Sequence, residues 1–288
     1  MNAIEIKELT KQYKGFTLDH ASLTLPQGCI MGLIGENGAG KSTMIKSMLG
    51  IARPDSGSIQ ILGTEITQDS DLAEIKNRTG VVLDDVGFPS MMKMPQIDKM
   101  LSQSYTKWDS SAFNGYLEQF GLPKDKAFGD FSKGMKMRAG LAAALSHNAE
   151  LLILDEPTSG LDPLVRDELV DMLADFTRDE THSILISSHI VSDLEKLCDY
   201  ITFLHKGELL LCEEKDRLYE QYGVLHTTAE KLAELDAAAV KGSRITDYGA
   251  EAIVDRALIP AGFELSPISI EELFVVMAKS DRKTGKEN

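Results

Sequence analysis

The chain has 288 residues, 43% of them apolar, so it can bury one large core or two unequal cores. Its formal charge of −15 disfavours binding to nucleic acid or to anionic lipid headgroups, because most of the surface would repel phosphate. No window reaches the about 18 consecutive apolar residues that a membrane helix requires, and the N-terminus is unlike a secretory signal, so we expect a folded protein that is neither exported nor membrane-spanning.

The opening third of the chain has the pattern of antiparallel strands followed by a buried strand. Ile4 and Ile6 would share one face of the first strand. The run CIMGLI (29–34) is apolar without alternation, as is typical of a strand buried on both faces. It leads into a glycine-rich loop at 35–43, and helical spacing follows the loop. Strand, loop and helix are the context that a phosphate-binding loop needs.

This loop matches the pattern G-x-x-x-x-G-K-[ST] at every fixed position. Its glycines would let backbone N–H groups turn toward one anion, and the following helix would add its positive end. Lys41 would reach the β- and γ-phosphates of a nucleoside triphosphate, and Ser42 would bind Mg²⁺. The loop residues that we expect to hold the nucleotide are Gly35, Asn37, Gly38, Ala39, Gly40, Lys41, Ser42 and Thr43.

The middle of the chain predicts a helical insertion and then two parallel strands. Residues from about 85 to 150 have a helical pattern and contain a cluster of methionines. The apolar runs LLILDE (151–156) and ILISSH (184–189) end abruptly in polar groups, as parallel strands do. Between them lies one apolar helical stripe, with Asp162 as the expected N-cap and Pro163 at the first helical position.

The last third of the chain contains a predicted hairpin and then a change in composition and periodicity. ITFLHKGELLLCEE predicts a hairpin that turns at Lys206 and Gly207. Beyond about residue 222 the sequence is Ala-rich, acidic and weakly periodic, and Ser269 and Glu272 have capping-box spacing before a last helix. We interpret this region as a small C-terminal appendage with a charged tail.

The strand end in LLILDEP supplies the second half of a hydrolytic site. Asp155 would be held toward a metal ion, and Glu156 beside it would polarise the attacking water. In isolation, a pair of acids after a parallel strand is as consistent with a structural role as with catalysis. The phosphate-binding loop in the same chain favours catalysis.

Four motifs occur in the order found in ATP-binding cassette ATPases: GENGAGKST, FSKGMKMRAG, LLILDEPTSGLDP and ISSH. The chain resembles this family over residues 1 to about 222. The resemblance implies an α/β fold of the P-loop NTPase type, with a RecA-like parallel sheet core, an antiparallel β-subdomain and the inserted helical subdomain at about 85–150. Residues 1–222 would form the nucleotide-binding domain, and residues 223–288 a small accessory domain.

The resemblance also implies a head-to-tail dimer that holds two ATP molecules between its chains. Each ATP would contact the phosphate loop of one chain and the signature segment, FSKGM, of the other. Ser132, as the N-cap of a helix, would form an anion-receiving terminus together with Gly134. Asp162 would belong to the loop that contacts the second chain, and His189 would touch the γ-phosphate.

An aromatic ring near the phosphate loop would stack on the adenine base. Two residues compete for this role in the sequence, Tyr13 and Phe16, which lie only three positions apart. We choose Tyr13 and keep Phe16 as the alternative.

Two departures from the family pattern concern charge. The signature segment usually reads LSGGQ, and this chain has Phe131, Lys133 and Met135 at three of its positions. Lys133 adds positive charge where phosphate is expected, so we predict that ATP binding survives. Where the family commonly places a glutamine that contacts Mg²⁺, Asp84 could take the metal contact. Gln96 is a distant alternative for this role. Alternatively, Asp84 has no metal contact and belongs to a solvated acidic turn.

Opening and closing such a dimer does work only on an attached partner. The resemblance to bacterial exporter ATPases implies a separately encoded, multi-helix permease, a second ATPase subunit of the same or another sequence, and a position at the cytoplasmic face of the cell membrane. The cargo would be a peptide, a drug or a lipid-like molecule, with import still open. A cluster of methionines would dock the permease or fill the core of the helical subdomain: Met91, Met92, Met94 and Met100. The alternative function is a soluble cassette ATPase with a nucleic-acid or regulatory role.

Overall fold

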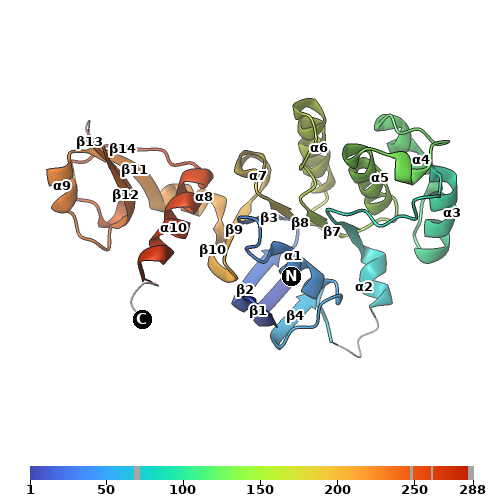
Figure 1. Cartoon of the computed structure of the whole chain (residues 1–288), viewed down its shortest axis with the longest axis horizontal. Coiled ribbons are helices and arrows are strands. Elements are labelled where there is room, and N and C mark those ends of the chain that lie inside the picture. Colours follow the sequence, from blue (N-terminus) through green and yellow to red (C-terminus); the bar gives the residue numbers. More distant parts are fainter. Residues whose placement is uncertain (68–71, 247–248, 261, 285–288) are drawn as a thin grey trace.

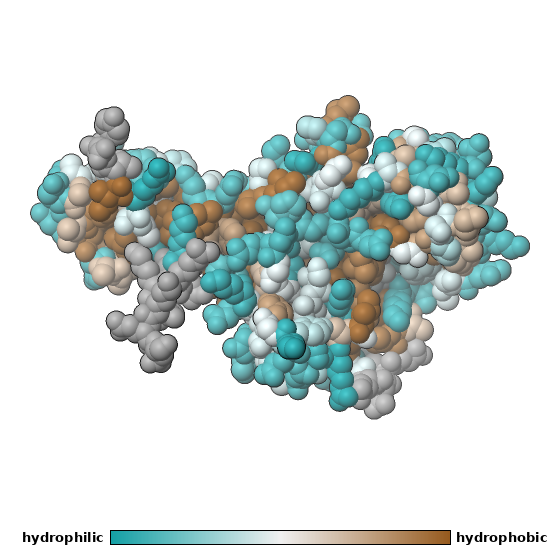
Figure 2. All heavy atoms as spheres, in the orientation of Figure 1, coloured by the Kyte–Doolittle hydropathy of each residue, from teal (hydrophilic) through white to brown (hydrophobic). Residues whose placement is uncertain are grey.

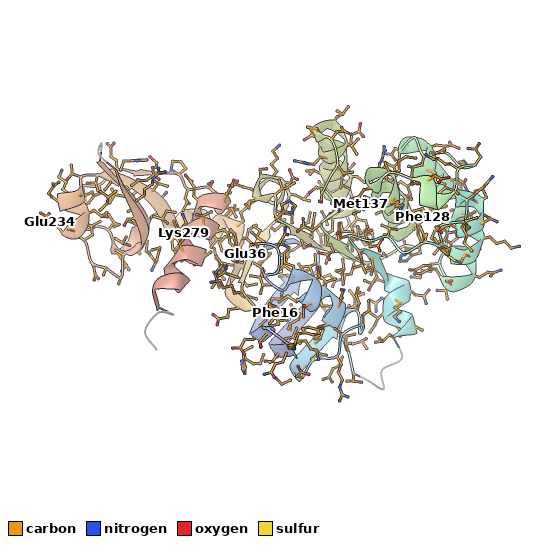
Figure 3. The ribbon with its side chains drawn as sticks, in the orientation of Figure 1. Phe16, Glu36, Phe128, Met137, Glu234 and Lys279 are labelled. Carbon is orange, nitrogen blue, oxygen red and sulfur yellow. The ribbon has the colours of Figure 1, made fainter. Side chains whose placement is uncertain are left out.

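The computed structural model describes residues 1–67, 72–246, 249–260 and 262–284, and these form three sheets with flanking helices. Figure 1 shows an elongated molecule with the parallel sheet in the middle, a group of helices at one end and the C-terminal sheet at the other. In Figure 3, Glu36, Phe128 and Glu234 mark these three parts in turn. The phosphate-binding loop therefore belongs to the middle part.

A six-stranded sheet at the centre carries the predicted motifs. Its order is β10-β9-β3-β8-β7-β6, parallel from β9 to β6, with β10 antiparallel at one edge. Every residue of β3, β7 and β8 is buried, which confirms the prediction from their apolar runs. The strands are β3 (Ile30–Ile34), β6 (Thr79–Val82), β7 (Leu151–Asp155), β8 (Ser183–Ser188), β9 (Tyr200–His205) and β10 (Glu208–Glu214).

Helices cover both faces of this sheet because alternate side chains of each strand point to opposite sides. Met31 and Leu33 of β3 pack into the core that contains α1 (Lys41–Met48). Ile30 and Ile34 pack into the core that contains α6 (Pro163–Phe176) and α7 (Val191–Leu197). As predicted, Asp162 caps the N-terminus of α6 and Pro163 is its first residue.

A second sheet, of order β2-β1-β4-β5, is antiparallel and packs on α1. Ile4 pairs with Leu25 and Ile6 with Leu23, so the alternating residues of the first two strands share one buried face. The prediction of antiparallel opening strands is confirmed. The strands are β1 (Asn2–Tyr13), β2 (Phe16–Pro26), β4 (Ser56–Ile61) and β5 (Thr64–Glu65).

The hairpin between β9 and β10 turns where the sequence predicts. Lys206 and Gly207 both have positive φ, 47° and 90°, as a tight two-residue hairpin turn requires. A Cβ on Gly207 would lie 1.8 Å from the carbonyl oxygen of Thr17, so only glycine fits at this position. The turn is thereby pressed against β2, beside the phosphate-binding loop.

The helical part has its own core, built around Phe113, Phe128 and Met94. Met94 is fully buried, Met92 and Met100 pack partly buried against the same core, and Met91 is 86% exposed. Core filling therefore accounts for most of the methionine cluster. The helices of this end are α3 (Met94–Ser104), α4 (Ser110–Gln119), the 3-10 turn η1 (Phe128–Asp130) and α5 (Lys133–Leu145). The short helix α2 (Ala73–Arg78) precedes β6 and packs through Ile75 into the core that contains α1.

The weakly periodic C-terminal region forms a third sheet, of order β12-β13-β11-β14, with α10 beginning at the predicted capping box of Ser269 and Glu272. Phe274 of α10 lies edge-on to Phe203 of β9, with ring centroids 5.2 Å apart. The division at 222 and 223 stays a prediction, and residues 285–288 of the expected charged tail lie outside the described residues. The elements are α8 (Lys215–Gln221), β11 (Tyr222–Thr227), α9 (Ala229–Ala233), β12 (Val240–Thr246), β13 (Gly249–Asp255), η2 (Arg256–Leu258), β14 (Leu265–Ser266) and α10 (Ile270–Thr284).

Candidate active site

The phosphate-binding loop joins the end of β3 to the start of α1. A Cβ on Gly35 would lie 2.5 Å from the carbonyl oxygen of Leu204, and a Cβ on Gly40 would lie 2.9 Å from the Phe16 ring. Gly40 also has a φ of 117°, which side-chain-bearing residues rarely adopt. These glycines let the loop close tightly over the sheet edge, with the N-terminus of α1 directed at the enclosed space.

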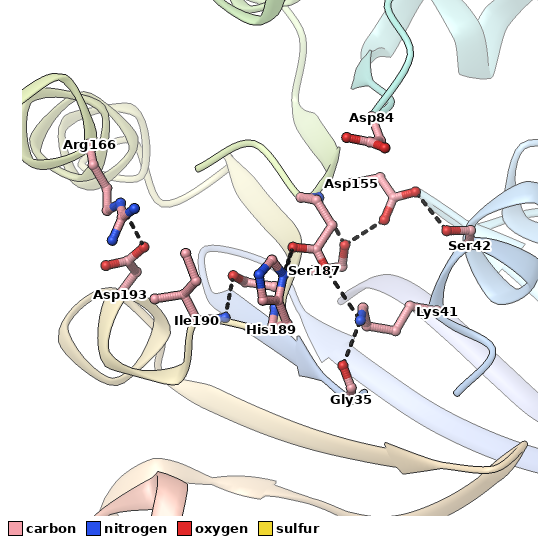
Figure 4. Close-up of polar contacts among 12 residues, drawn as sticks. Gly35, Lys41, Ser42, Asp84, Asp155, Arg166, Ser187, His189, Ile190 and Asp193 are labelled. Atoms are coloured by element: carbon pink, nitrogen blue, oxygen red, sulfur yellow. Dashed lines mark hydrogen bonds and ion pairs between the residues drawn. The ribbon is translucent and has the colours of Figure 1, made fainter. Parts of the chain in front are cut away.

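Lys41 is buried and turns back over this loop. Its Nζ donates to the carbonyl oxygen of Gly35 at 2.6 Å and lies 3.1 Å from Oε1 of Glu156. Both contacts are drawn in Figure 4. The ammonium is thus held between the loop backbone and the acidic strand end, where a phosphate group bound in the loop would meet it.

Asp155 is the last residue of β7, and its carboxylate is buried. Oδ2 accepts a hydrogen bond from Ser42 Oγ at 2.9 Å, and Oδ1 accepts one from Ser187 Oγ at 2.6 Å. The structure therefore brings together Ser42 of α1 and Asp155 of β7, two of the three residues predicted to bind a metal ion. Their oxygen atoms are the hard ligands that Mg²⁺ prefers.

Ser187 is a site residue that the sequence reasoning missed. It pairs with Asp155 across the parallel strands β7 and β8, and its Oγ also accepts from the backbone N–H of Glu156 at 3.0 Å. One hydroxyl thus orients both acidic residues. The available signal was its place near the end of ILISSH, since parallel strands bring their carboxyl ends to the same edge of a sheet.

Glu156 lies between the loop lysine and the predicted histidine. Its Oε2 accepts from Nδ1 of His189 at 2.6 Å and from the backbone N–H of His189 at 3.3 Å, while Oε1 faces Lys41. Glu156 has a φ of 53°, a left-handed conformation that is uncommon for a non-glycine residue and clusters at functional sites. Of the three residues predicted to be catalytic, Glu156 is therefore in direct contact with both Lys41 and His189.

Lys41, Asp155 and Glu156 border one open cavity of about 540 Å³, within the range of small-molecule sites, whereas His189 is not among its lining residues. Asp84, the predicted replacement for the family's glutamine, reaches the same cavity, and Figure 4 draws it beside Asp155. The distant alternative, Gln96, instead caps the N-terminus of α3 through its bond from the Lys93 N–H. The residues lining the cavity are Gly15, Phe16, Glu36, Asn37, Gly38, Gly40, Lys41, Ser42, Thr43, Asp84, Asp155 and Glu156.

Phe16, the alternative platform for adenine, belongs to this lining, and Tyr13 does not. Tyr13 is 48% exposed, and its ring carries the Lys11 ammonium 5.4 Å from the centroid. The choice of Tyr13 stays a prediction, with the alternative ring nearer to the phosphate loop.

The signature segment lies apart from this lining. Ser132 caps α5 as predicted and accepts from the Met135 N–H at 3.3 Å, while Asp162 caps α6 and accepts from the Val165 N–H at 3.2 Å. A Cβ on Gly134 would lie 3.2 Å from Leu161, so the signature segment packs on the loop that precedes α6. Ser132, Gly134 and Asp162 therefore form a second group of predicted residues, next to the first but outside its cavity.

The side-chain oxygen atoms at the site suit Mg²⁺ rather than a metal ion whose ligands all come from the protein. Among the residues that the structure describes, no group of three or more His, Cys, Asp or Glu side chains could by itself hold a metal ion. Mg²⁺ is usually bound by one or two carboxylates together with water and substrate phosphates. Ser42, Asp155 and Asp84 fit that pattern.

Comparison with known proteins gives concordant matches. A family model described as "ABC transporter" matches residues 18–159. The bacitracin transport ATP-binding protein BcrA of Enterococcus faecalis is 36% identical over 82% of this chain and 74% of its own length. The lantibiotic transport ATP-binding protein SrtF of Streptococcus pyogenes is 36% identical over 74% of this chain and 91% of its own length. The solved structure of an ATP binding subunit of an ABC transporter has a TM-score of 0.69 at 25% identity, covering 76% of this chain and 92% of that one.

Proposed function

The chain belongs to the ATP-binding cassette (ABC) transporter family, and from this membership we propose that its ATP hydrolysis drives export of a peptide through a separately encoded membrane permease. The observation that carries the proposal is the position of Glu156, which joins Lys41 to His189 beside Asp155. A nucleotide-binding loop without a carboxylate so placed would bind ATP without a base for the attacking water. The ATPase activity itself follows from membership of the family.

The contacts assign a role to each group. Lys41 binds the β- and γ-phosphates, while Ser42 and Asp155, with Asp84 as a third oxygen donor, hold Mg²⁺, which would offset phosphate charge when bound. Glu156 accepts a proton from the attacking water, and His189, whose Nδ1 lies 2.6 Å from Glu156 Oε2, orients that carboxylate and, as the family resemblance implies, would touch the γ-phosphate. The loop residues already named hold the remaining phosphates through their backbone N–H groups.

A second cassette would complete the site. Ser132, Lys133, Gly134 and Asp162 lie outside the cavity lining of their own chain. The capped N-terminus of α5 is free to receive the ATP of another chain, as the family resemblance implies. We infer a homodimer or heterodimer of nucleotide-binding domains, each spanning residues 1–222, with residues 223–288 as an accessory domain.

The names of the relatives support a peptide cargo. Bacitracin and lantibiotics are peptides, and the relatives that transport them match this chain over most of its length. BcrA and SrtF are named as transport proteins, so these relatives do not support the alternative of a non-transport ATPase. Among the described residues, no helix is long and apolar enough to cross a bilayer. We accordingly place the chain at the cytoplasmic face of the membrane, attached through its permease.

A hydrophobic groove offers a site for that permease. The groove has a volume of about 600 Å³ and lies between α1, α2, β6 and α3, where Figure 2 shows hydrophobic residues gathering between α1 and α2. Ile51, Leu83 and Leu101 are among its lining residues, and Leu83 directly precedes Asp84 of the nucleotide cavity. An amphipathic cytoplasmic helix of the permease would bury its apolar face here. An occupant would therefore touch the segment that leads to the catalytic site.

The test is a detergent pull-down of tagged Glu156→Gln from its own host with ATP, since blocked hydrolysis should trap the assembled complex. We expect a polytopic membrane protein to co-purify, and Glu168→Gln, an exposed change on α6, to trap much less of it. Adding Ile51→Glu, at the 64% exposed edge of the groove, should release the permease but leave ATP binding intact. Recovery of nucleic acid or of soluble partners only would refute transport, and unchanged bacitracin and lantibiotic sensitivity of a deletion strain would refute these cargoes.

A further inference from the structure

The two charge departures from the family pattern touch each other. Lys133 Nζ lies 2.7 Å from Asp84 Oδ1, although the two residues belong to different motifs. One is the first residue of α5, and the other follows β6 and reaches the nucleotide cavity. We propose that Lys133 is a positioning residue that acts within its own chain: it holds and neutralises Asp84 at the cavity and so strengthens ATP binding by a single cassette. This inference rests on the proposed function.

The packing of α5 fixes the distance between the two groups. A Cβ on Gly140 would lie 3.0 Å from Val86 and 3.3 Å from Val82, so the helix backbone is pressed directly against the segment that contains Asp84. Lys133 and Gly140 are seven residues apart and share one face of α5. The lysine is therefore directed at residues 82–86 by the same close contact that seats the helix.

The path of the lysine stem is set inside the chain as well. A Cβ on Gly160 would lie 3.9 Å from Lys133 Cδ, so the aliphatic part of the side chain runs beside the loop that precedes α6. Its ammonium meets Asp84 at the end of that path. A lysine held in this way is directed at Asp84 of its own chain.

The cavity lining is acidic, so an ion pair that neutralises one of its carboxylates would favour ATP binding. Among the described residues that line the cavity, Glu36, Asp84, Asp155 and Glu156 are acidic and only Lys41 is basic. Lys41 already faces Glu156, so in the absence of Mg²⁺ no cation of the cavity lining is left to offset the repulsion between Asp84 and the phosphates of ATP. Lys133 supplies that cation from outside the lining.

The expected effect is modest because both side chains are about half exposed, 53% for Lys133 and 56% for Asp84. Pairs of this kind are partly screened by solvent and change an equilibrium by only about twofold to fivefold. We expect Lys133→Ala to weaken ATP binding by that factor, and Asp84→Asn to remove most of this loss when the two changes are combined. The difference between wild type and Lys133→Ala should shrink in about 1 M salt, where the Debye length falls to about 3 Å.

The experiment is equilibrium binding of ATP to the full chain without Mg²⁺, so that the role of Asp84 toward the metal does not enter, at protein concentrations where light scattering shows a monomer. The set is wild type, Lys133→Ala, Asp84→Asn, the double variant, and Lys136→Ala as a control that removes one positive charge from the same helix. Matching thermal transitions would show that each variant folds. A salt-sensitive loss in Lys133→Ala alone, absent from Lys136→Ala and rescued by Asp84→Asn, supports action within the chain.

Other outcomes distinguish a failure of the role given to Lys133 from a failure of the proposed function. Wild-type ATP affinity in monomeric Lys133→Ala, with a defect only in ATP-driven dimerisation, would overturn the inference and place the lysine at the second chain's nucleotide. Equal losses in Lys133→Ala and Lys136→Ala, or additive losses in the double variant, would also overturn it. A wild-type chain that binds no ATP would instead overturn the proposed function on which the inference rests.

Discussion

Replacing Ser187 by alanine tests whether one hydroxyl orients both acidic residues of the site. The change removes a buried hydrogen bond to the Asp155 carboxylate, at 2.6 Å, and one from the Glu156 N–H, at 3.0 Å. The Glu156 N–H keeps a second acceptor, the carbonyl oxygen of residue 187 at 3.1 Å, so the loss falls mainly on the carboxylate. A hydrogen bond to a charged group contributes roughly 1.5–3 kcal/mol.

We expect Ser187→Ala to lower the free energy of unfolding by about 2 kcal/mol, or the melting temperature by about 4–8 °C. Asp155 would then be held by Ser42 alone, so its position toward Mg²⁺ would loosen. Loss of such an outer partner typically costs about 10–100-fold in metal affinity or activity. The assays are denaturant unfolding and the Mg²⁺ concentration required for half-maximal ATPase activity.

Ser183→Ala is the matched control. Ser183 lies on the same strand, is equally buried, and accepts one hydrogen bond from the Gly28 N–H at 3.0 Å, far from the site. It should lose about 1 kcal/mol and leave the Mg²⁺ dependence unchanged. If both variants lost the same stability and neither altered the Mg²⁺ requirement, the role given to Ser187 would be refuted.

Three further changes test the fold around the site. Arg78 donates to both carboxylate oxygens of Glu150, at 2.9 and 2.6 Å, and lowers the pKa of that carboxyl. The pair therefore stabilises the protein above the ordinary glutamate pKa, and this contribution is lost as pH falls through the lowered pKa of Glu150. Glu150→Gln should cost about 1 kcal/mol at pH 7 and progressively less at acid pH, by urea unfolding; a cost that does not change with pH would contradict this. Gly207→Ala should cost more than about 2 kcal/mol in the same assay, because its Cβ would meet a β2 carbonyl; a neutral result would contradict the close contact. Phe274→Ala should lose about 2–3 kcal/mol by removing the ring that packs on Phe203 and should increase protease cleavage of the C-terminal sheet, and unchanged cleavage would count against that packing.

Local features of the sequence sufficed for the elements and for the main catalytic set. The glycine spacing of the phosphate loop, the apolar runs that became β3, β7 and β8, and the caps Ser132 and Asp162 are all fixed by residues within one turn or one strand of each other. Parallel strands then bring their carboxyl ends to one edge, so Lys41, Asp155 and Glu156 had to converge.

The C-terminal region shows where local signals failed. Its weak periodicity concealed four strands, because a sheet built from short segments of mixed polarity is held together by pairing between strands rather than by a pattern within each. Its joint core with β9, through Phe203 and Phe274, has no signature in either segment alone.

The sequence by itself determined which residues could bind phosphate, hold a metal ion and activate water, since those roles depend on residue type and short spacing. Only the tertiary structure decided which side chains are joined by a hydrogen bond from a distant hydroxyl and which form an ion pair. Ser187 reaches Asp155 because two strands are adjacent, and Lys133 reaches Asp84 because Gly140 lets α5 approach the segment after β6. Such contacts join residues 32 and 49 positions apart, and they depend on the distance between packed backbones, which no local pattern encodes.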